Sequence, residues 1–103
     1  MSELPRLSST ERLILELLAI EPEMFGLQMV ERSVGRLKRG TVYVTLGRMH
    51  EKGYVETRQE ELPIGNLGIP RRLYRASGHG LRVLAAWKAA EQSFLNQSVA
   101  QEA

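Results

Sequence analysis

The chain contains 103 residues, of which 43% are hydrophobic and 25% are charged, with a formal net charge of +2. This composition is typical of one small globular domain, and so short a chain has no room for a deep catalytic cavity, so binding is favoured over catalysis. The sequence has no cysteine, which excludes disulfides, a cysteine-ligated zinc site and a thiol nucleophile. No apolar run is long enough for a membrane span and residues 1–5 do not resemble a signal peptide, so we expect a cytoplasmic protein with no membrane contact.

The first predicted helix begins at a capping box. In Ser8-Ser9-Thr10-Glu11 the serine side chain caps a backbone N–H three residues on, and the glutamate reaches back. Apolar residues then follow at helical spacing: Leu13, Ile14, Leu17 and Leu18. We expect this helix to run to about Ala19, because Pro22 cannot continue a helix and restricts the residue before it.

Two more helices are expected before residue 54. The second covers about residues 26–33, and Gly35 supplies its C-terminal glycine; its inward positions are Met24, Leu27 and Val30. The third covers about residues 39–52 and ends at Gly53. Its apolar residues recur at i, i+4 and i+7, so this stripe of Val42, Leu46 and Met49 should face the core.

The second half of the chain predicts a β-hairpin and a long helix. Residues 54–58 and 72–76 are rich in strand-forming residues. The loop between them contains glycine and proline, and we expect a mobile tip there. Residues 77–98 are rich in alanine and free of proline, which favours a helix.

Three short helices followed by a hairpin is the element order of a winged helix-turn-helix. The sequence therefore predicts a mainly α fold with a small β-hairpin. We expect a DNA-binding domain over residues 8–76 and a C-terminal dimerisation helix over residues 77–98. In this fold the third helix enters the major groove of DNA, and the hairpin, or wing, contacts the flanking backbone.

Positive charge is concentrated in the segments that face DNA in this fold. Residues 32–53 contain six Lys or Arg residues and one Glu, whereas residues 1–31 contain six Glu and two Arg. Residues 58–75 carry a further excess of Arg, including Arg71 and Arg72 at the base of the wing. Such a distribution is typical of a surface that binds a polyanion.

The face of the third helix opposite the core has residue types that suit a DNA groove. It contains Thr41, Val44, Thr45, Arg48 and Lys52, with Tyr43 beside them and no carboxylate among them. Threonine can contact phosphates or bases, valine a thymine methyl, and arginine a guanine. Lys38 and Arg39 precede the helix, where they can hold a phosphate.

Other interpretations of these residues stay open. The third helix could be an exposed basic surface, and a winged helix can bind a protein instead of DNA, because fold does not fix function. An enzyme is not expected. His50 and His79 have no metal-ligand spacing and are interpreted as surface or hinge residues, so we expect no metal and no cofactor. Ser8, Ser9 and Ser77 start helices, and no His–acid pair is spaced to activate them.

The last helix carries an apolar stripe that needs a cover. Val83, Trp87, Ala90 and Phe94 follow helical spacing, and Leu84 and Leu95 widen the stripe. Leu81 and Leu84 lie in the first turns and should pack on the helix's own domain. A second copy of the chain is the commonest cover for the remainder, which predicts a homodimer; the alternative is that the helix folds back. Trp87 is either dimer packing or one wall of a slot for a small aromatic effector.

Three segments of the sequence resemble the PadR transcriptional regulators of prokaryotes, over about residues 13–77. The first is Leu13 to Leu18 followed by Phe25-Gly26-Leu27-Gln28-Met29. The second and most specific is residues 40–56, which open with Gly40-Thr41-Val42-Tyr43. The third is Pro70-Arg71-Arg72-Leu73-Tyr74-Arg75-Ala76-Ser77, similar to the family's return strand. The resemblance implies a dimeric repressor that small ligands or other signals release from double-stranded DNA. Because a homodimer would place two recognition helices about one turn of DNA apart, we expect a near-palindromic operator.

The chain departs from the family pattern at three places. Val44 stands where the family often has proline, and Ser77-Gly78-His79-Gly80 stands where its last helix opens with Thr-x-x-Gly. The wing, residues 62–69, lacks the arginine-rich glycine turn that is common in the family. The length of the chain fits the short members, which have a single C-terminal helix for dimerisation.

Overall fold

The computed structural model describes the backbone of residues 3–102 and the side chains of residues 3–97. Four helices and three short strands follow in the order α1 (Ser9–Ile20), β1 (Met24–Phe25), α2 (Gly26–Arg32), α3 (Arg39–Glu51), β2 (Val55–Gln59), β3 (Arg72–Ala76) and α4 (Gly78–Glu102). The strands form one antiparallel sheet in the order β1-β3-β2. The mainly α fold with a small hairpin, expected from the sequence, is confirmed.

The expected capping box starts α1. Ser8 Oγ accepts a hydrogen bond from the Glu11 backbone N–H at 3.1 Å, and Glu11 Oε1 accepts one from the Ser8 N–H at 2.9 Å. Ser8 is therefore the N-cap, and the helix ends at Ile20, two residues before Pro22. One face of α1 is buried in the core, which brings this helix against α3.

The turn between α2 and α3 is held by a serine. Ser33 Oγ donates to the Val30 carbonyl at 2.8 Å and accepts from the Leu37 N–H at 2.9 Å. The C-cap of α2 is Ser33, and the left-handed residue directly after it is Val34, with a φ of +52°, in place of the expected Gly35. Gly35 follows with a φ of +84°, a backbone conformation that favours glycine. The apolar stripe of α3 is fully buried, as expected: Val42, Leu46 and Met49.

The hairpin has the expected strands, but a third strand joins it. Phe25 and Met24 of β1 pair with Leu73 and Tyr74 of β3. Met24 was expected to be an inward helical residue; it is buried, but it lies in this strand. A strand of two residues shows no alternation of apolar and polar residues, so the sequence gives no signal for it.

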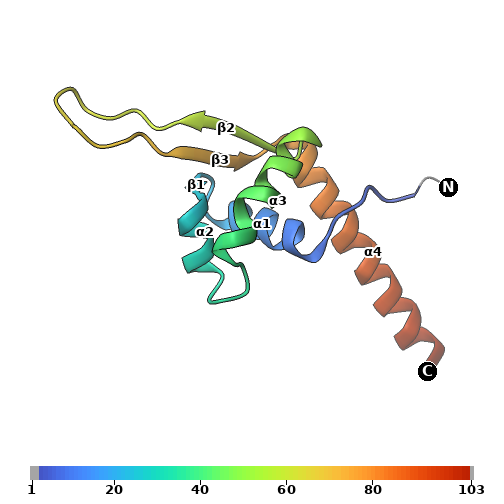
Figure 1. Ribbon diagram of the computed structural model, residues 1–103. Helices are drawn as coiled ribbons and strands as arrows, with labels where there is room; N and C mark the ends of the chain where they lie inside the picture. The colour runs from blue at the N-terminus through green and yellow to red at the C-terminus, as the bar shows by residue number, and fades with distance from the viewer. Residues whose placement is uncertain (1–2, 103) are drawn as a thin grey trace.

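The wing and α4 project from opposite sides of the helical body, so the molecule measures 66 × 28 × 21 Å (Figure 1). Where α4 begins, it packs very closely against the turn that follows α3. A Cβ on Gly80 would lie 2.1 Å from the carbonyl oxygen of Tyr54, so only glycine fits. Further along, Glu91 accepts hydrogen bonds from Arg12 of α1, and beyond it α4 leaves the body (Figure 1). In the described residues no helix is both long enough and apolar enough to cross a membrane.

Candidate nucleic-acid interface

The outer face of α3 is exposed over most of the expected residues. Thr41, Val44 and Arg48 are exposed, and Tyr43 beside them is 52% exposed. Because the opposite stripe is fixed in the core, this face cannot turn inward. The fold therefore presents a hydroxyl, an aliphatic side chain, a phenol and a guanidinium along one helix.

Thr45 is a correction to the expected stripe. It is only 9% exposed, and its hydroxyl donates to the Thr41 carbonyl at 2.9 Å. Thr45 lies three residues after Val42 and four before Met49, so it borders the buried stripe, and the segment before α1 lies across the same side of α3. Its side chain is therefore less accessible to an incoming ligand than those of Thr41, Val44 and Arg48.

Lys52 is on the expected face, but it is occupied. Its Nζ donates to Glu11 Oε2 at 2.7 Å. Burial acts to raise the pKa of Glu11, but the hydrogen bonds from Lys52 and Ser8 outweigh it, so the pKa lies below its ordinary value. Lys52 is therefore part of a partly buried ion pair and is less available to a phosphate than the other cations of α3.

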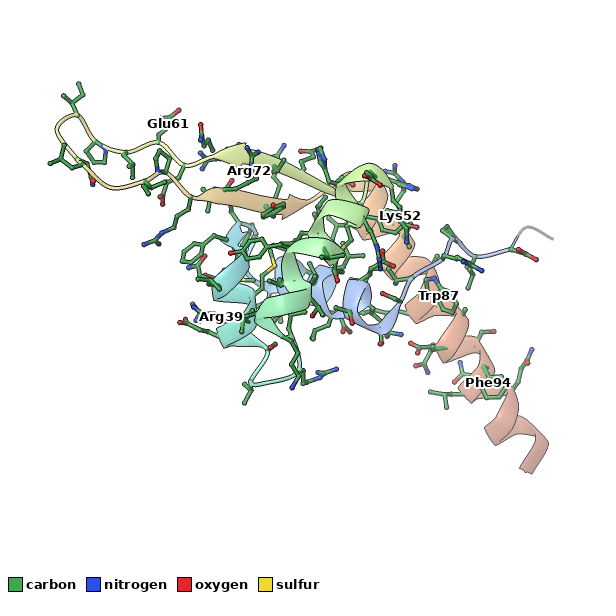
Figure 2. All side chains as sticks on the ribbon, viewed as in Figure 1. Arg39, Lys52, Glu61, Arg72, Trp87 and Phe94 are labelled. Atoms are coloured by element: carbon green, nitrogen blue, oxygen red, sulfur yellow. The ribbon has the colours of Figure 1, made fainter. Side chains whose placement is uncertain are left out.

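The other basic residues on or beside α3 form no ion pair among the described residues. Five cations of the described residues form ion pairs with carboxylates: Arg12, Arg32, Lys52, Arg58 and Arg75. None of these pairs involves Lys38, Arg39 or Arg48. Arg39 lies at the start of α3 (Figure 2). No carboxylate of the described residues therefore neutralises the positive charges of Lys38, Arg39 and Arg48, which lie on or beside α3.

The guanidinium groups of the two arginines at the wing base form no ion pair among the described residues, although the Arg71 backbone N–H donates to Glu60 Oε1 at 3.4 Å. Arg71 places its guanidinium 4.4 Å from the centroid of the Phe25 ring, and Arg72 Nη1 lies 3.3 Å from Thr57 Oγ1. Figure 2 shows Arg72 on β3, and Glu61 further out along the wing. Beyond them the tip is apolar, since Ile64, Leu67 and Ile69 are exposed. The positive charge of the wing is therefore at its base and not at its tip.

Tyr43 depends on a glycine in the preceding helix. A Cβ on Gly26 would lie 2.7 Å from Tyr43 Cε1, so the phenol ring packs directly on the first residue of α2. This contact joins two of the segments that carry the family resemblance. The sequence shows both residues, but it gives no sign that they touch.

The expected seam on α4 needs two corrections. Val83 is 3% exposed and belongs to the core of its own domain, whereas Leu81, expected in the core, is exposed. Both lie in the first turns, where the close approach at Gly80 sets which face of α4 meets the body. Leu84 is buried as expected. The second half of α4 extends away from the body, so the alternative in which this helix folds back over its own domain is not found (Figure 1).

The remaining seam residues lie around a shallow apolar hollow of about 720 Å³ on α4. Ala90 is exposed, and Phe94, which Figure 2 shows far out on the helix, is 68% exposed. Trp87 is half-buried, and its Nε1 donates to the Pro5 carbonyl at 2.8 Å. Exposed apolar side chains at this spacing need a partner surface.

The two histidines lie apart. His50 is exposed on α3, and the His79 ring packs at 5.4 Å between centroids on Tyr54. Among the described residues, no three His, Asp or Glu side chains come close enough to hold a metal ion.

Residues 14–86 match the family model described as the transcriptional regulator PadR-like family. The chain belongs to the PadR-like family of transcriptional regulators. The match begins within α1 and continues through the helix-turn-helix and the wing to the first turns of α4, so the family resemblance of the sequence is confirmed. The family and its structural neighbours are transcription regulators and not enzymes.

Solved structures share this PadR-like fold. A PadR family transcription regulator from hypervirulent Clostridium difficile is 24% identical, with a TM-score of 0.70 over 91% of this chain and 97% of that one. A PadR-like transcription factor from Bacteroides fragilis is 24% identical, with a TM-score of 0.71 over 89% and 87%. A PadR family regulator from Eggerthella lenta is 22% identical, with a TM-score of 0.67 over 87% and 77%. The sequence matches none of the curated proteins with which it was compared.

Proposed function

We propose that this PadR-like regulator binds a near-palindromic operator on double-stranded DNA as a homodimer and represses transcription. The supporting observation is the charge distribution: Lys38, Arg39 and Arg48 lie on or beside α3 outside the ion pairs of the described residues. Uncompensated cations on an exposed recognition helix favour a polyanion. Such a protein works where the chromosome lies, in the cytoplasm of a prokaryote.

Each residue of the interface has a role that follows from its chemistry. Arg48 forms two hydrogen bonds to a guanine, and Val44 packs on a thymine methyl. Thr41 and Tyr43 donate to phosphates or base edges. The remaining cations bind phosphates and position the protein without reading sequence: Lys38, Arg39, Arg71 and Arg72. Thr45 makes no base contact, because it is largely buried and its hydroxyl donates to the Thr41 carbonyl.

Dimerisation would proceed through α4. The winged-helix domain covers residues 8–76 and the dimerisation helix residues 77–98, with Ala90, Phe94 and one face of Trp87 on the seam. Val83 anchors the helix to its own domain. A two-fold dimer places two copies of α3 about 34 to 36 Å apart, one turn of DNA, which makes the operator near-palindromic.

A small aromatic effector would bind at the same seam. The hollow beside Trp87 and Phe94 becomes more enclosed when a second copy covers it, and an aromatic wall suits a flat ligand. Trp87 is the sole tryptophan of the chain, so its fluorescence reports on this place alone. A ligand that quenches Trp87 and releases DNA would support the effector role.

The decisive experiment compares wild type with Arg48→Ala on a DNA duplex that the wild-type protein enriches from a random-sequence pool. We expect Arg48→Ala to lose about 1 to 3 kcal/mol of discrimination between this duplex and an unrelated one. Arg75→Ala is the control, because Arg75 is paired with Glu56 on the wing. If Arg48→Ala and wild type discriminate equally between the two duplexes, Arg48 on α3 does not recognise the DNA sequence.

Salt dependence separates this proposal from a protein-binding winged helix. Affinity for DNA falls with salt along a log–log slope of about −0.9 for each phosphate contact. Two results together would favour the protein-binding function: the wild-type protein selects no duplex from the random pool, and its affinity for DNA does not fall with salt along this slope.

A further inference from the structure

A second surface borders the outer face of α3. A hollow of about 700 Å³ lies between the N-terminal segment and α3. Arg6, Ser8 and Thr10 line it from one side, and Thr41, Val44 and Arg48 line it from the other. We refer to this hollow as the arm notch, and to residues 4–8 as the arm. Leu7, Glu11, Thr45 and Lys52 complete the lining, so the arm notch includes three of the residues proposed to enter the major groove: Thr41, Val44 and Arg48.

The arm notch is positively charged. Its lining contains Arg6, Arg48, Lys52 and one carboxylate, that of Glu11. Both oxygens of Glu11 are occupied, Oε1 by the Ser8 N–H and Oε2 by Lys52. Arg6 and Arg48 take part in none of the ion pairs among the described residues. Two guanidinium groups therefore face one polar hollow without a carboxylate to satisfy them.

The arm is held in place beside α3 by aromatic side chains. Tyr54, which follows α3, donates its hydroxyl to the Arg6 carbonyl at 2.9 Å. Trp87 donates its Nε1 to the neighbouring Pro5 carbonyl at 2.8 Å, and Figure 2 shows it beside the arm. Leu7 packs against the core. With its backbone fixed at two successive carbonyls, the arm presents Arg6 at a defined position.

We propose that the arm notch receives the sugar-phosphate backbone at the edge of the major groove that α3 enters. Arg6 is the phosphate-binding residue, the hydroxyls of Ser8 and Thr10 line the path of the strand, and Tyr54 and Trp87 are positioning residues. The groove that a recognition helix enters is bordered by phosphates, and most protein–DNA hydrogen bonds go to them. This inference rests on the proposed function, since it needs DNA on α3.

The test uses the full chain and two labelled duplexes, one enriched by wild type from a random pool and one unrelated. For Arg6→Ala we expect affinity for both duplexes to fall about tenfold, as for the loss of one charge-assisted hydrogen bond. The slope of log affinity against log salt should become shallower by about 0.9, since one phosphate contact is lost. The ratio of the two affinities should stay unchanged, because a phosphate contact reads no sequence.

Two further variants separate a phosphate contact from a structural role. Arg6→Lys keeps the charge and should restore the salt slope. Tyr54→Phe removes only the hydroxyl that holds the arm. It should lower the affinity for both duplexes less than Arg6→Ala does, and it should also make the slope of log affinity against log salt shallower. Arg75→Ala, which removes a paired arginine from the wing, is the matched control and should leave both affinities unchanged.

The outcomes distinguish this proposal from the one on which it rests. If wild type binds both duplexes and Arg6→Ala binds them equally well, the arm notch holds no phosphate although the proposed function stands. If Arg6→Ala weakens binding but keeps the wild-type salt slope, its role is structural and the proposal is overturned. If wild type binds no duplex, both proposals fail.

Discussion

Lys52, at the end of α3, lies 2.7 Å from the carboxylate of Glu11 in the first turn of α1. The pair joins the recognition helix to the capping box that starts the domain. Its two members differ in exposure, since the Glu11 side chain is only 5% exposed and that of Lys52 is 37% exposed. Loss of either charge should therefore affect the stability of the winged-helix domain.

The Glu11 pair predicts a loss of stability in acid. Because the pKa of Glu11 is lowered in the folded chain from its ordinary value of 4.5, its ionised form stabilises the fold above that pH. This contribution should disappear as the pH falls from about 4.5 through the folded pKa. In Glu11→Gln this part of the pH dependence should be absent. Thermal unfolding over a pH series measures it.

An exposed glutamate serves as the control for Glu11. Glu31→Gln on α2 should keep the wild-type pH profile, because Glu31 is exposed and joins no ion pair of the described residues. Lys52→Met should lower stability by about 1 to 3 kcal/mol, because it leaves the buried carboxylate without its charged partner. Parallel pH profiles for Glu11→Gln and wild type would contradict the role assigned to the pair.

Two glycines in helices should respond oppositely to alanine. In Gly80→Ala the new Cβ meets the backbone carbonyl of Tyr54, which cannot move without shifting the end of α3, so we expect a loss of about 1 to 3 kcal/mol or more. Gly47 in α3 has no atom within 4 Å of the same position. Gly47→Ala should therefore gain about 0.5 to 1 kcal/mol from helix propensity. Urea unfolding gives the free energy of unfolding of both variants. Equal changes in this free energy would contradict the prediction.

Gly26→Ala should weaken DNA binding more than it lowers stability. The new Cβ meets the ring of Tyr43, which is partly exposed and can rotate away, so the fold tolerates the change while the phenol leaves its place on α3. The double variant Gly26→Ala/Tyr43→Ala should bind as Tyr43→Ala does, because the two residues act through one contact. Fluorescence anisotropy with the enriched duplex tests this. Additive losses in the double variant would mean that Gly26 acts independently of Tyr43.

The sequence predicts the parts of this fold that are encoded locally. The capping box at Ser8 and the buried stripe of α3 each depend on a few neighbouring residues, and both are confirmed. Strand β1 is missed because two residues carry no periodicity. It forms only because β3, nearly fifty residues away along the chain, offers an edge.

Errors at the candidate site have one physical origin. Thr45 and Val83 have the right spacing for an outward stripe, but helical spacing does not show which neighbouring segment covers a residue at the border of a stripe. The N-terminal segment covers the side of Thr45, and the close approach at Gly80 turns Val83 into the core. Long-range contacts such as Tyr54 to Arg6 and Trp87 to Pro5 have no local signature either. They place the arm beside α3, which sequence patterns alone do not indicate.

The dimer through α4 is tested by Phe94→Asp. Phe94 is exposed in the single chain and lines the apolar hollow, so a charge there should not unfold the domain but should prevent a second copy from covering it. Truncating a buried aromatic typically costs about 3 to 5 kcal/mol, and a buried charge costs more, which is enough to dissociate a micromolar dimer. We expect light scattering to give a dimer for wild type and a monomer for Phe94→Asp. Ser93→Asp places the same charge on a neighbouring residue outside the hollow and should remain dimeric.

Operator binding should be lost together with the dimer, because each monomer holds only half of the contacts. If Phe94→Asp keeps the wild-type mass, or if wild type is monomeric at tens of micromolar, about the range that populates even a weak dimer, the seam on α4 is wrong. A monomeric variant that binds the enriched duplex as tightly as wild type would mean that one winged helix is sufficient. In that case the near-palindromic operator would no longer be expected, whereas the assignment of Arg48 to base reading would be unaffected.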